Sequence, residues 1–250
     1  MKRILLATAL AITTFTAPAS ATDLMDMTDS ERDVFRAEVR AYLMENPEVL
    51  LEAINVLEQR QAAEEAVNDT TLVQTNANDI FNDGVSYVGG NPDGDVTVVE
   101  FSDYRCPYCK RAHKEVAKLL AGDENIKFIY KEFPILGPDS LTAAQFAVAV
   151  LLQASPEKYH DVSNALMEMR GEPSEAALIN IADEFGLDSA ALLDKMKSSE
   201  VTQIIQANRA LGQRLKVSGT PAFIFGDQIV RGFVPLDSMQ AFVEKARKPE

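Results

Sequence analysis

The feature that most restricts the fold is a pair of cysteines placed where a buried strand gives way to a helix. Cys106 and Cys109 are the only cysteines among 250 residues. A β-branched run over residues 96–101 precedes them, and Pro107 suits the first position of a helix. A disulfide between residues three apart closes a very small loop and constrains the unfolded chain little. The pair is therefore better explained by chemistry than by structural cross-linking.

The predicted helix start gives the two cysteines different roles. Cys106 falls at the cap, where the helix dipole and the backbone donors favour a thiolate, which is the nucleophilic form of cysteine. Cys109 lies one turn later on the same face, so the two sulfur atoms can bond to each other. We therefore predict that Cys106 attacks with a strongly depressed pKa and that Cys109 resolves the resulting mixed disulfide.

Two other interpretations of the cysteine pair stay open. One is an inert structural disulfide. The other is a metal site, because His113 follows Cys109 by four residues on the same helix and could complete a set of three ligands. A structural zinc site needs four ligands, and His160 is distant in sequence. We expect no dedicated metal and no cofactor besides the redox-active disulfide, with Cu(I) on the thiolate pair as a secondary activity.

Glu100 is an acidic residue inside the apolar strand that precedes the cysteines. A buried carboxyl group there would have a raised pKa and could shuttle a proton for Cys109. Lys131, in the next predicted strand, is a plausible partner for it. The alternatives are an edge-strand glutamate that faces water and an ordinary surface lysine.

A second motif is Thr220-Pro221, which follows Gly219 and precedes a predicted strand. Proline at the first residue of a strand is a position where a cis peptide bond is found, and an ordinary trans strand start is the alternative. A cis bond would point the Thr220 backbone at an extended substrate segment. We predict that Thr220 and Pro221 contact substrate together with Pro107 and Tyr108.

The chain divides into four parts by composition. Lys2 and Arg3, an apolar stretch and a small-residue site at Ala19 to Ala21 indicate a signal peptide over residues 1–21. We expect a helical oligomerisation region at 22–66, a polar linker or frayed helix end at 67–78 and a catalytic domain at 79–250. The catalytic domain is α/β, with the order strand, helix, strand, a helical insert over about 139–216, then hairpin and helix.

The predicted export places the protein in an extracytoplasmic compartment. No later segment is long and apolar enough to span a membrane. The formal net charge is −14, and removal of the signal peptide makes it more negative, so nucleic acid is an improbable partner.

The amino-terminal helices have apolar stripes that need a covering surface. Two short helices with one stripe each cannot bury a core alone. We expect them to oligomerise, and packing on their own catalytic domain is the alternative. The residues of the stripes are Phe35, Val39, Leu43, Leu50, Ile54 and Leu57.

The segment from Val99 to Cys109 resembles the active-site strand and helix of DsbA-like periplasmic oxidoreductases. The segment from Gly219 to Phe223 resembles their cis-proline loop. This resemblance covers about residues 79–247 and implies a thioredoxin fold with Cys106 as the exposed nucleophile and Glu100 as an acid. The dipeptide between the cysteines is Pro-Tyr, where the oxidase DsbA has Pro-His, and Thr220 stands where that oxidase has Val. Both differences favour a role other than dedicated dithiol oxidation.

The segment from Tyr42 to Ala53 is similar to the leader of ScsC-like proteins, the suppressors of copper sensitivity. In that group the amino-terminal helices oligomerise and a CPYC site isomerises or reduces disulfides. The resemblance implies a periplasmic isomerase or reductase that acts on exported proteins with cysteines and is recycled by a membrane redox partner. A Cu(I)-handling dithiol protein and a DsbA-like dithiol oxidase are the alternative functions.

Overall fold

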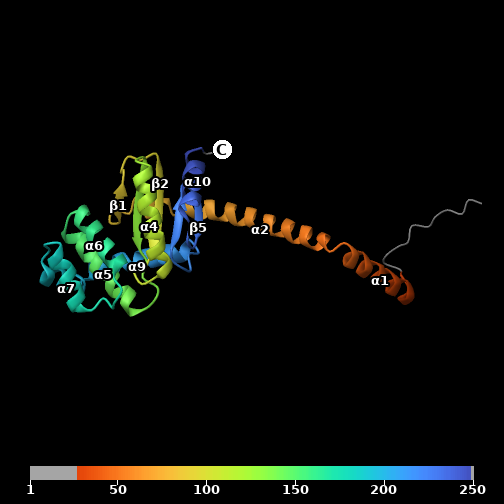
Figure 1. The fold of residues 1–250 in the computed structure, drawn as a ribbon, viewed down its shortest axis with the longest axis horizontal. Coiled ribbons are helices and arrows are strands. Elements are labelled where there is room, and N and C mark those ends of the chain that lie inside the picture. The colour runs from red at the N-terminus through yellow and green to blue at the C-terminus, as the bar shows by residue number, and fades with distance from the viewer. Residues whose placement is uncertain (1–26, 249–250) are drawn as a thin grey trace, which may run out of the picture. The chain divides into compact units, whose positions relative to one another are not determined.

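A computed structural model describes residues 27–248 of the chain, so the expected signal peptide lies outside the described residues. The described part divides between Arg60 and Gln61 into two compact units. Within this part the helices and strands run in the following order: α1 (Asp29–Glu45), α2 (Glu48–Thr75), α3 (Ala77–Phe81), β1 (Tyr87–Gly90), β2 (Val96–Ser102), α4 (Pro107–Gly122), β3 (Ile126–Glu132), α5 (Pro138–Gln153), α6 (Pro156–Glu168), α7 (Glu175–Glu184), α8 (Ser189–Lys195), α9 (Ser199–Arg214), β4 (Ala222–Phe225), β5 (Gln228–Arg231) and α10 (Leu236–Arg247) (Figure 1).

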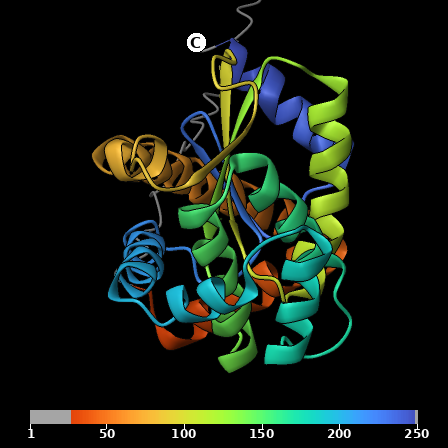
Figure 2. The same cartoon turned by 90° about the vertical axis from the view of Figure 1, so that its left-hand side faces the viewer.

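The second unit is built on a five-stranded mixed sheet in the order β1-β3-β2-β4-β5. Strand β2 lies at the centre, parallel to β3 and antiparallel to β4. Helices α4 and α10 pack on one face of the sheet, and α3 and α9 pack on the other (Figure 2). Because both faces are covered, six of the seven residues of β2 are buried. This is the α/β thioredoxin fold that the sequence predicted, and α5 to α9 form the expected helical insert between β3 and β4.

The expected linker at 67–78 is helical, which corrects the prediction. Helix α2 continues to Thr75, and two residues of its last turns, Asp69 and Val73, are buried. The Asp69 carboxylate accepts one hydrogen bond of 2.8 Å from each terminal nitrogen of Arg231 in β5. Val73 belongs to the apolar cluster that includes Phe101 of β2. These tertiary contacts stabilise the helix over residues whose own helix propensity is modest.

The first unit contains α1 and the first half of α2. Thr28 caps α1 through a capping box with Glu31. None of the residues of α1 is buried. Phe35, Leu50 and Ile54 each keep about half of their surface exposed, at 48%, 49% and 50%. Within this unit, the apolar stripes that the sequence predicted are therefore not covered.

Candidate functional site

The cysteine pair lies at the start of α4, directly after the loop that leaves β2. Cys106 is the N-cap residue and Pro107 is the first helical residue, as the sequence predicted. Both cysteines are free thiols in this structure. Cys106 keeps 5% of its surface exposed and Cys109 none, whereas Tyr108 between them is 55% exposed. The nucleophile that the resemblance implied to be exposed is thus largely buried, and its sulfur atom contacts the Thr220 carbonyl oxygen.

The surroundings of Cys106 stabilise its thiolate. The largest cause is a hydrogen bond from the Cys109 thiol, and burial acts in the opposite direction. Thr220 and the backbone N–H groups of Cys109 and Tyr108 add further stabilisation. Together they lower the pKa of Cys106 from 9.0 to about 5. The protonated thiol donates to the Thr220 carbonyl oxygen at 3.3 Å.

Cys109 has the opposite electrostatic environment. Burial is the main reason why its pKa lies above the ordinary value of a thiol. The hydrogen bond to Cys106 and the charge of Glu100 raise the pKa of Cys109 further. At neutral pH the pair therefore shares one proton, which remains on Cys109 while Cys106 is ionised. This is the division of roles that the helix geometry predicted.

Glu100 lies in β2 with 1% of its surface exposed, and its Oε1 atom has no hydrogen-bond partner. Burial is the main reason why its pKa is raised from 4.5 to about 8. The nearby Ser102 hydroxyl group lowers the pKa of Glu100, and the charge of Cys106 raises it. With a pKa of about 8, this buried carboxyl group is mostly protonated at neutral pH but keeps a minor ionised fraction, which can accept a proton from a nearby donor.

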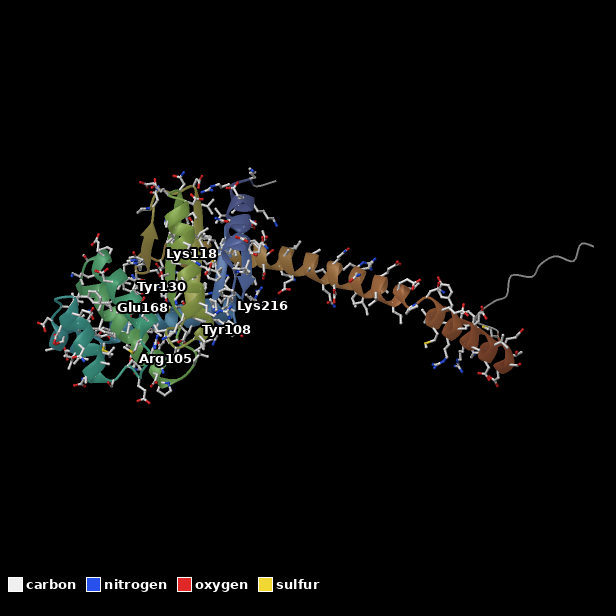
Figure 3. The ribbon with its side chains drawn as sticks, viewed as in Figure 1. Arg105, Tyr108, Lys118, Tyr130, Glu168 and Lys216 are labelled. Carbon is white, nitrogen blue, oxygen red and sulfur yellow. The ribbon has the colours of Figure 1, made fainter. Side chains whose placement is uncertain are left out.

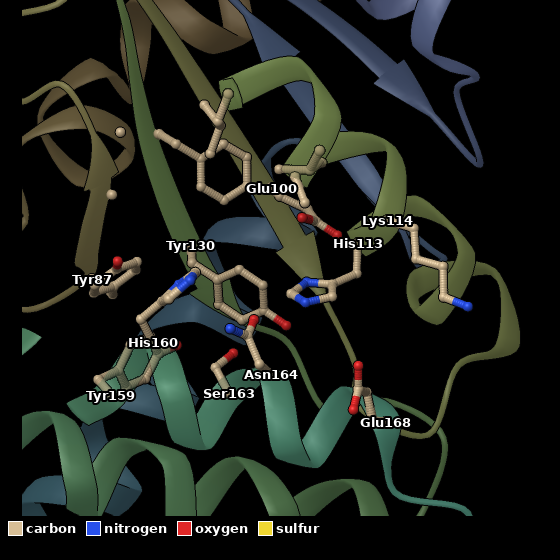
Figure 4. A pocket seen from close by; sticks show the side chains of 16 residues that line it. Tyr87, Glu100, His113, Lys114, Tyr130, Tyr159, His160, Ser163, Asn164 and Glu168 are labelled. Atoms are coloured by element: carbon tan, nitrogen blue, oxygen red, sulfur yellow. The ribbon is translucent and has the colours of Figure 1, made fainter. Parts of the chain in front are cut away.

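Glu100 lines a cavity of about 330 Å³ between α4, α6 and the sheet. The Glu100 carboxylate and the His113 imidazole both point into this cavity (Figure 4). The pKa of His113 is lowered, chiefly by burial, so the imidazole is neutral at pH 7. His113 and Glu100 line the same cavity.

Lys131 is not the partner of Glu100, which corrects the prediction. In the parallel register Glu100 lies opposite Tyr130 and Phe101 lies opposite Lys131, so the Glu100 and Lys131 side chains leave opposite faces of the sheet. The Lys131 ammonium group donates to Asp83 at 2.6 Å and to the Asp79 carbonyl oxygen at 2.8 Å.

The peptide bond between Thr220 and Pro221 is cis, which confirms the prediction from the sequence. The loop brings this bond beside Cys106, although 114 residues separate Thr220 from the cysteine. Arg111 adds a side chain that the sequence analysis missed: its guanidinium group lies 5.6 Å from the ring centre of Tyr108 and 4.6 Å from that of Phe233. Contact of substrate with Pro107, Tyr108, Thr220 and Pro221 remains a prediction.

Glu132 is a second buried carboxyl group beneath the site, and it was also missed. Its Oε1 atom accepts hydrogen bonds of 2.7 Å from the hydroxyl groups of Tyr104 and Tyr159. Burial raises the pKa of Glu132 to about 8. The signal in the sequence was similar to that for Glu100, an acidic residue in an apolar strand. Glu132 is the last residue of β3 and lies opposite Ser102 of β2.

Among residues 27–248, no group of three or more His, Cys, Asp and Glu side chains has the arrangement of a metal site. His113 therefore does not join the cysteines as a third ligand in this structure. In the same part of the chain, no helix combines the length and the apolar character needed to cross a bilayer.

Comparison with known proteins gives two family matches. Residues 97–244 match the DSBA-like thioredoxin domain, and residues 31–64 match the N-terminal domain of the copper resistance protein ScsC. Among curated proteins, the chain is 28% identical over 162 residues to the Na(+)/H(+) antiporter NhaA 1 of Salinispora arenicola. That match covers 64% of this chain but 24% of the antiporter.

Two of the similar solved structures match this chain over nearly their whole length. A thioredoxin-like oxidoreductase from Silicibacter pomeroyi DSS-3 is 45% identical, with a TM-score of 0.65 over 69% of this chain and 98% of that one. ScsC of Proteus mirabilis in a transitional conformation is 26% identical, with a TM-score of 0.63 over 88% of this chain and 99% of that one.

Proposed function

The chain belongs to the DsbA-like thioredoxin family, and from this premise we propose that it isomerises or reduces disulfides in exported proteins. The observation that supports the proposal most strongly is the contrast within the cysteine pair. The pKa of Cys106 is lowered to about 5, whereas that of Cys109 is raised. Stabilising the Cys106 thiolate favours the reduced form of the site, which is the form that an isomerase uses.

The proposed reaction starts with attack by the Cys106 thiolate on one sulfur of a substrate disulfide. A Cys106–substrate bond forms, the substrate bond breaks, and the second substrate sulfur leaves as a thiolate. In isomerisation, another substrate thiolate attacks the mixed disulfide and Cys106 leaves as a thiolate, without net oxidation. In reduction, Cys109 gives its proton to the Glu100 carboxylate and attacks Cys106, which releases the substrate thiolate and oxidises the cysteine pair.

The proposed location is the periplasm, reached through the signal peptide at residues 1–21. A membrane redox partner would return the oxidised cysteine pair to its reduced form. We further propose that the amino-terminal helices form a homo-oligomer through the exposed stripe that includes Leu50 and Ile54. Several Cys106 thiolates around one substrate would raise the chance that a released substrate thiol is captured again.

Reactivation of scrambled ribonuclease by the reduced protein tests this function. The expected result is recovery of ribonuclease activity without added oxidant and none with Cys106→Ser. The Cys109→Ser variant should accumulate a mixed disulfide with ribonuclease, because the resolving thiol is absent. If the reduced protein leaves scrambled ribonuclease inactive, the isomerase proposal is wrong.

Dithiol oxidation is the second candidate function, because a stabilised Cys106 thiolate also makes the disulfide form a stronger oxidant. Oxidative refolding of reduced ribonuclease by the oxidised protein measures this activity separately. An oxidase would refold reduced ribonuclease quickly and scrambled ribonuclease slowly, whereas the proposed isomerase shows the opposite ratio.

A further inference from the structure

We propose that a groove beside Cys106 binds an acidic segment of the substrate polypeptide, next to the cysteine under attack. The groove has a volume of about 770 Å³ and lies between the first turns of α4 and the end of α6. Pro107, which follows the nucleophile directly, is part of its wall. The inference rests on the proposed function, since it names the class of substrate that the same site would select.

The groove is strongly cationic in a chain whose formal net charge is −14. Six ionised side chains line it, and Glu168 is the only acid among them; the cations are Arg105, Lys110, Arg111, Lys114 and Arg170. Arg105 and Glu168, which both line the groove, are labelled in Figure 3. We name this surface the cationic groove.

Most of the cations in the cationic groove have no acidic partner among the described residues. Arg105 lies 3.7 Å from Asp139, which is a long ion pair. Within residues 27–248 no ion pair involves Lys110, Arg111, Lys114 or Arg170. Burial and the positive charge of Arg105 lower the pKa of Lys110, as expected where cations gather without enough carboxylates. An acidic ligand would relieve this repulsion.

The wall of the cationic groove is held in place by hydrogen bonds to the loop after α6. Lys110 donates to the Met169 carbonyl oxygen, and Arg105 donates to the Gly171 carbonyl oxygen at 2.5 Å. Met167 and Met169 are the apolar side chains that line the groove besides Pro107, and the flexible methionine side chain adapts to varied partners. A preformed groove with cationic walls and adaptable methionine side chains suits an extended segment that contains Asp or Glu beside apolar residues.

Electrostatic steering gives the cationic groove its effect on the reaction. The acidic surface of the rest of the chain repels an acidic segment, and the groove is the place where that segment is attracted. Cys106 is bonded to Pro107 of the groove wall, so attraction raises the local concentration of cysteines with acidic neighbours. The proposal therefore predicts a preference that appears in the association step and weakens with salt.

The test uses the full mature chain in its reduced form. Three peptides of equal length each have one cysteine in a disulfide with thionitrobenzoate, flanked on both sides by Asp and Glu, by Asn and Gln, or by Lys. The second-order rate of thionitrobenzoate release is measured at low and at high ionic strength. The acidic peptide should react roughly tenfold faster than the neutral one at low ionic strength, and this ratio should approach one at high ionic strength.

Substitution of Lys114 and Arg170 assigns the preference to the cationic groove. Lys114→Gln with Arg170→Gln should abolish most of the preference and leave the rate with the neutral peptide unchanged. Lys197→Gln with Lys245→Gln removes two charges elsewhere on the same unit and should keep the preference. Equal rates for the acidic and neutral peptides, or a preference that survives in the groove variant, would overturn the inference. Failure to react with all three peptides would instead contradict the proposed function.

Discussion

Helices in both units of this chain have regularly spaced apolar residues, but these residues are exposed in the first unit and buried in the second. In the first unit, the apolar residues of α1 and early α2 are exposed, and α1 has no buried residue. In the second unit, α4 has apolar residues at similar spacing, and four of them, Cys109, Ala112, Val116 and Leu119, are buried. Periodicity therefore predicts which side of a helix is apolar, but the rest of the chain decides whether that side is covered.

The residues of the reaction and the residues expected to associate copies of the chain therefore lie in different units. The second unit contains two buried apolar clusters, both cysteines, Glu100 and the cis-proline loop, so all of these site residues belong to one unit. The first unit leaves large apolar side chains exposed, and contiguous exposed apolar surface is typical of an interaction site. We therefore expect changes in the second unit to alter the reaction and changes in the first unit to alter the association of copies.

The largest expected effect concerns the thiol chemistry of the second unit. The alkylation rate of Cys106 should follow a titration with a midpoint near pH 5, because its pKa is lowered from 9.0 to about 5. At pH 7 almost all of Cys106 is thiolate, against roughly one part in a hundred for an ordinary thiol with a pKa of 9. Mass spectrometry of protein pulsed with iodoacetamide measures the profile for each cysteine. A midpoint above pH 8 for Cys106 would contradict the geometry assigned to the site.

The second effect is loss of assembly without loss of chemistry. Leu50→Asp with Ile54→Asp places two charges on the exposed stripe of the first unit, which an interface between copies could not bury cheaply. Light scattering should show an oligomer for the parent chain and a monomer for the variant. Glu52→Gln with Glu58→Gln, on the same helix, is the matched control. A monomeric parent chain would remove the basis for the comparison between the two units.

The third effect tests the buried acid of the second unit. The raised pKa of Glu100 means that the native state favours the protonated carboxyl group. Stability from this group is complete below the unfolded-state pKa of about 4.5 and is lost as pH rises through about 8. Glu100→Gln does not titrate, so its free energy of unfolding relative to the parent should rise by several kcal/mol between pH 4 and pH 9, at about 1.4 kcal/mol per unit of pKa.

Denaturant unfolding of the reduced proteins at a series of pH values gives that difference. The same Glu100→Gln variant should resolve mixed disulfides more slowly at neutral pH, because Cys109 loses its proton acceptor. A difference in stability that stays constant with pH would show that Glu100 is ionised and solvated in the native state.

The fourth and smallest effect locates the boundary between the units. A chain that begins at Gln61 keeps Asp69 and Val73, whereas a chain that begins at Asn76 loses both. The shorter chain should be less stable by about 3 kcal/mol, because burial of a valine contributes about 1.5–3 kcal/mol and the partly exposed ion pair with Arg231 adds less. Urea unfolding compares the two. Equal stability would place the boundary at the polar segment that the sequence suggested.

The sequence was sufficient for features that depend on local chemistry. A β-branched run, a cysteine cap and a following proline determine the strand and the helix start around Cys106, and the cis bond before Pro221 was predictable from its Gly-Thr-Pro setting. Glu100 was identified because a charged residue inside an apolar run is unusual. The covered faces of the sheet and the helical insert followed from the order of the elements.

The errors arose where residues distant in sequence determine the outcome. The polar stretch at 67–78 lacks a local signal for burial. Contacts with residues distant in sequence, Arg231 with Asp69 and the apolar cluster around Val73, make that part of α2 a component of the second unit. The partner of Lys131 depended on strand register, which decides the face that each side chain occupies. The cationic groove could not be seen in the sequence either, because Arg170 lies 60 residues after Lys110.

The most direct test of the division between the units is the rate of scrambled ribonuclease reactivation per Cys106, compared between the full mature chain and the chain that begins at Gln61. Both chains should alkylate at Cys106 with the same pH profile, which shows that the site is intact. The account predicts that the full chain reactivates ribonuclease faster per site and that the shortened chain retains thiol exchange with peptides. Equal reactivation by the two chains would contradict the claim that the first unit controls isomerisation.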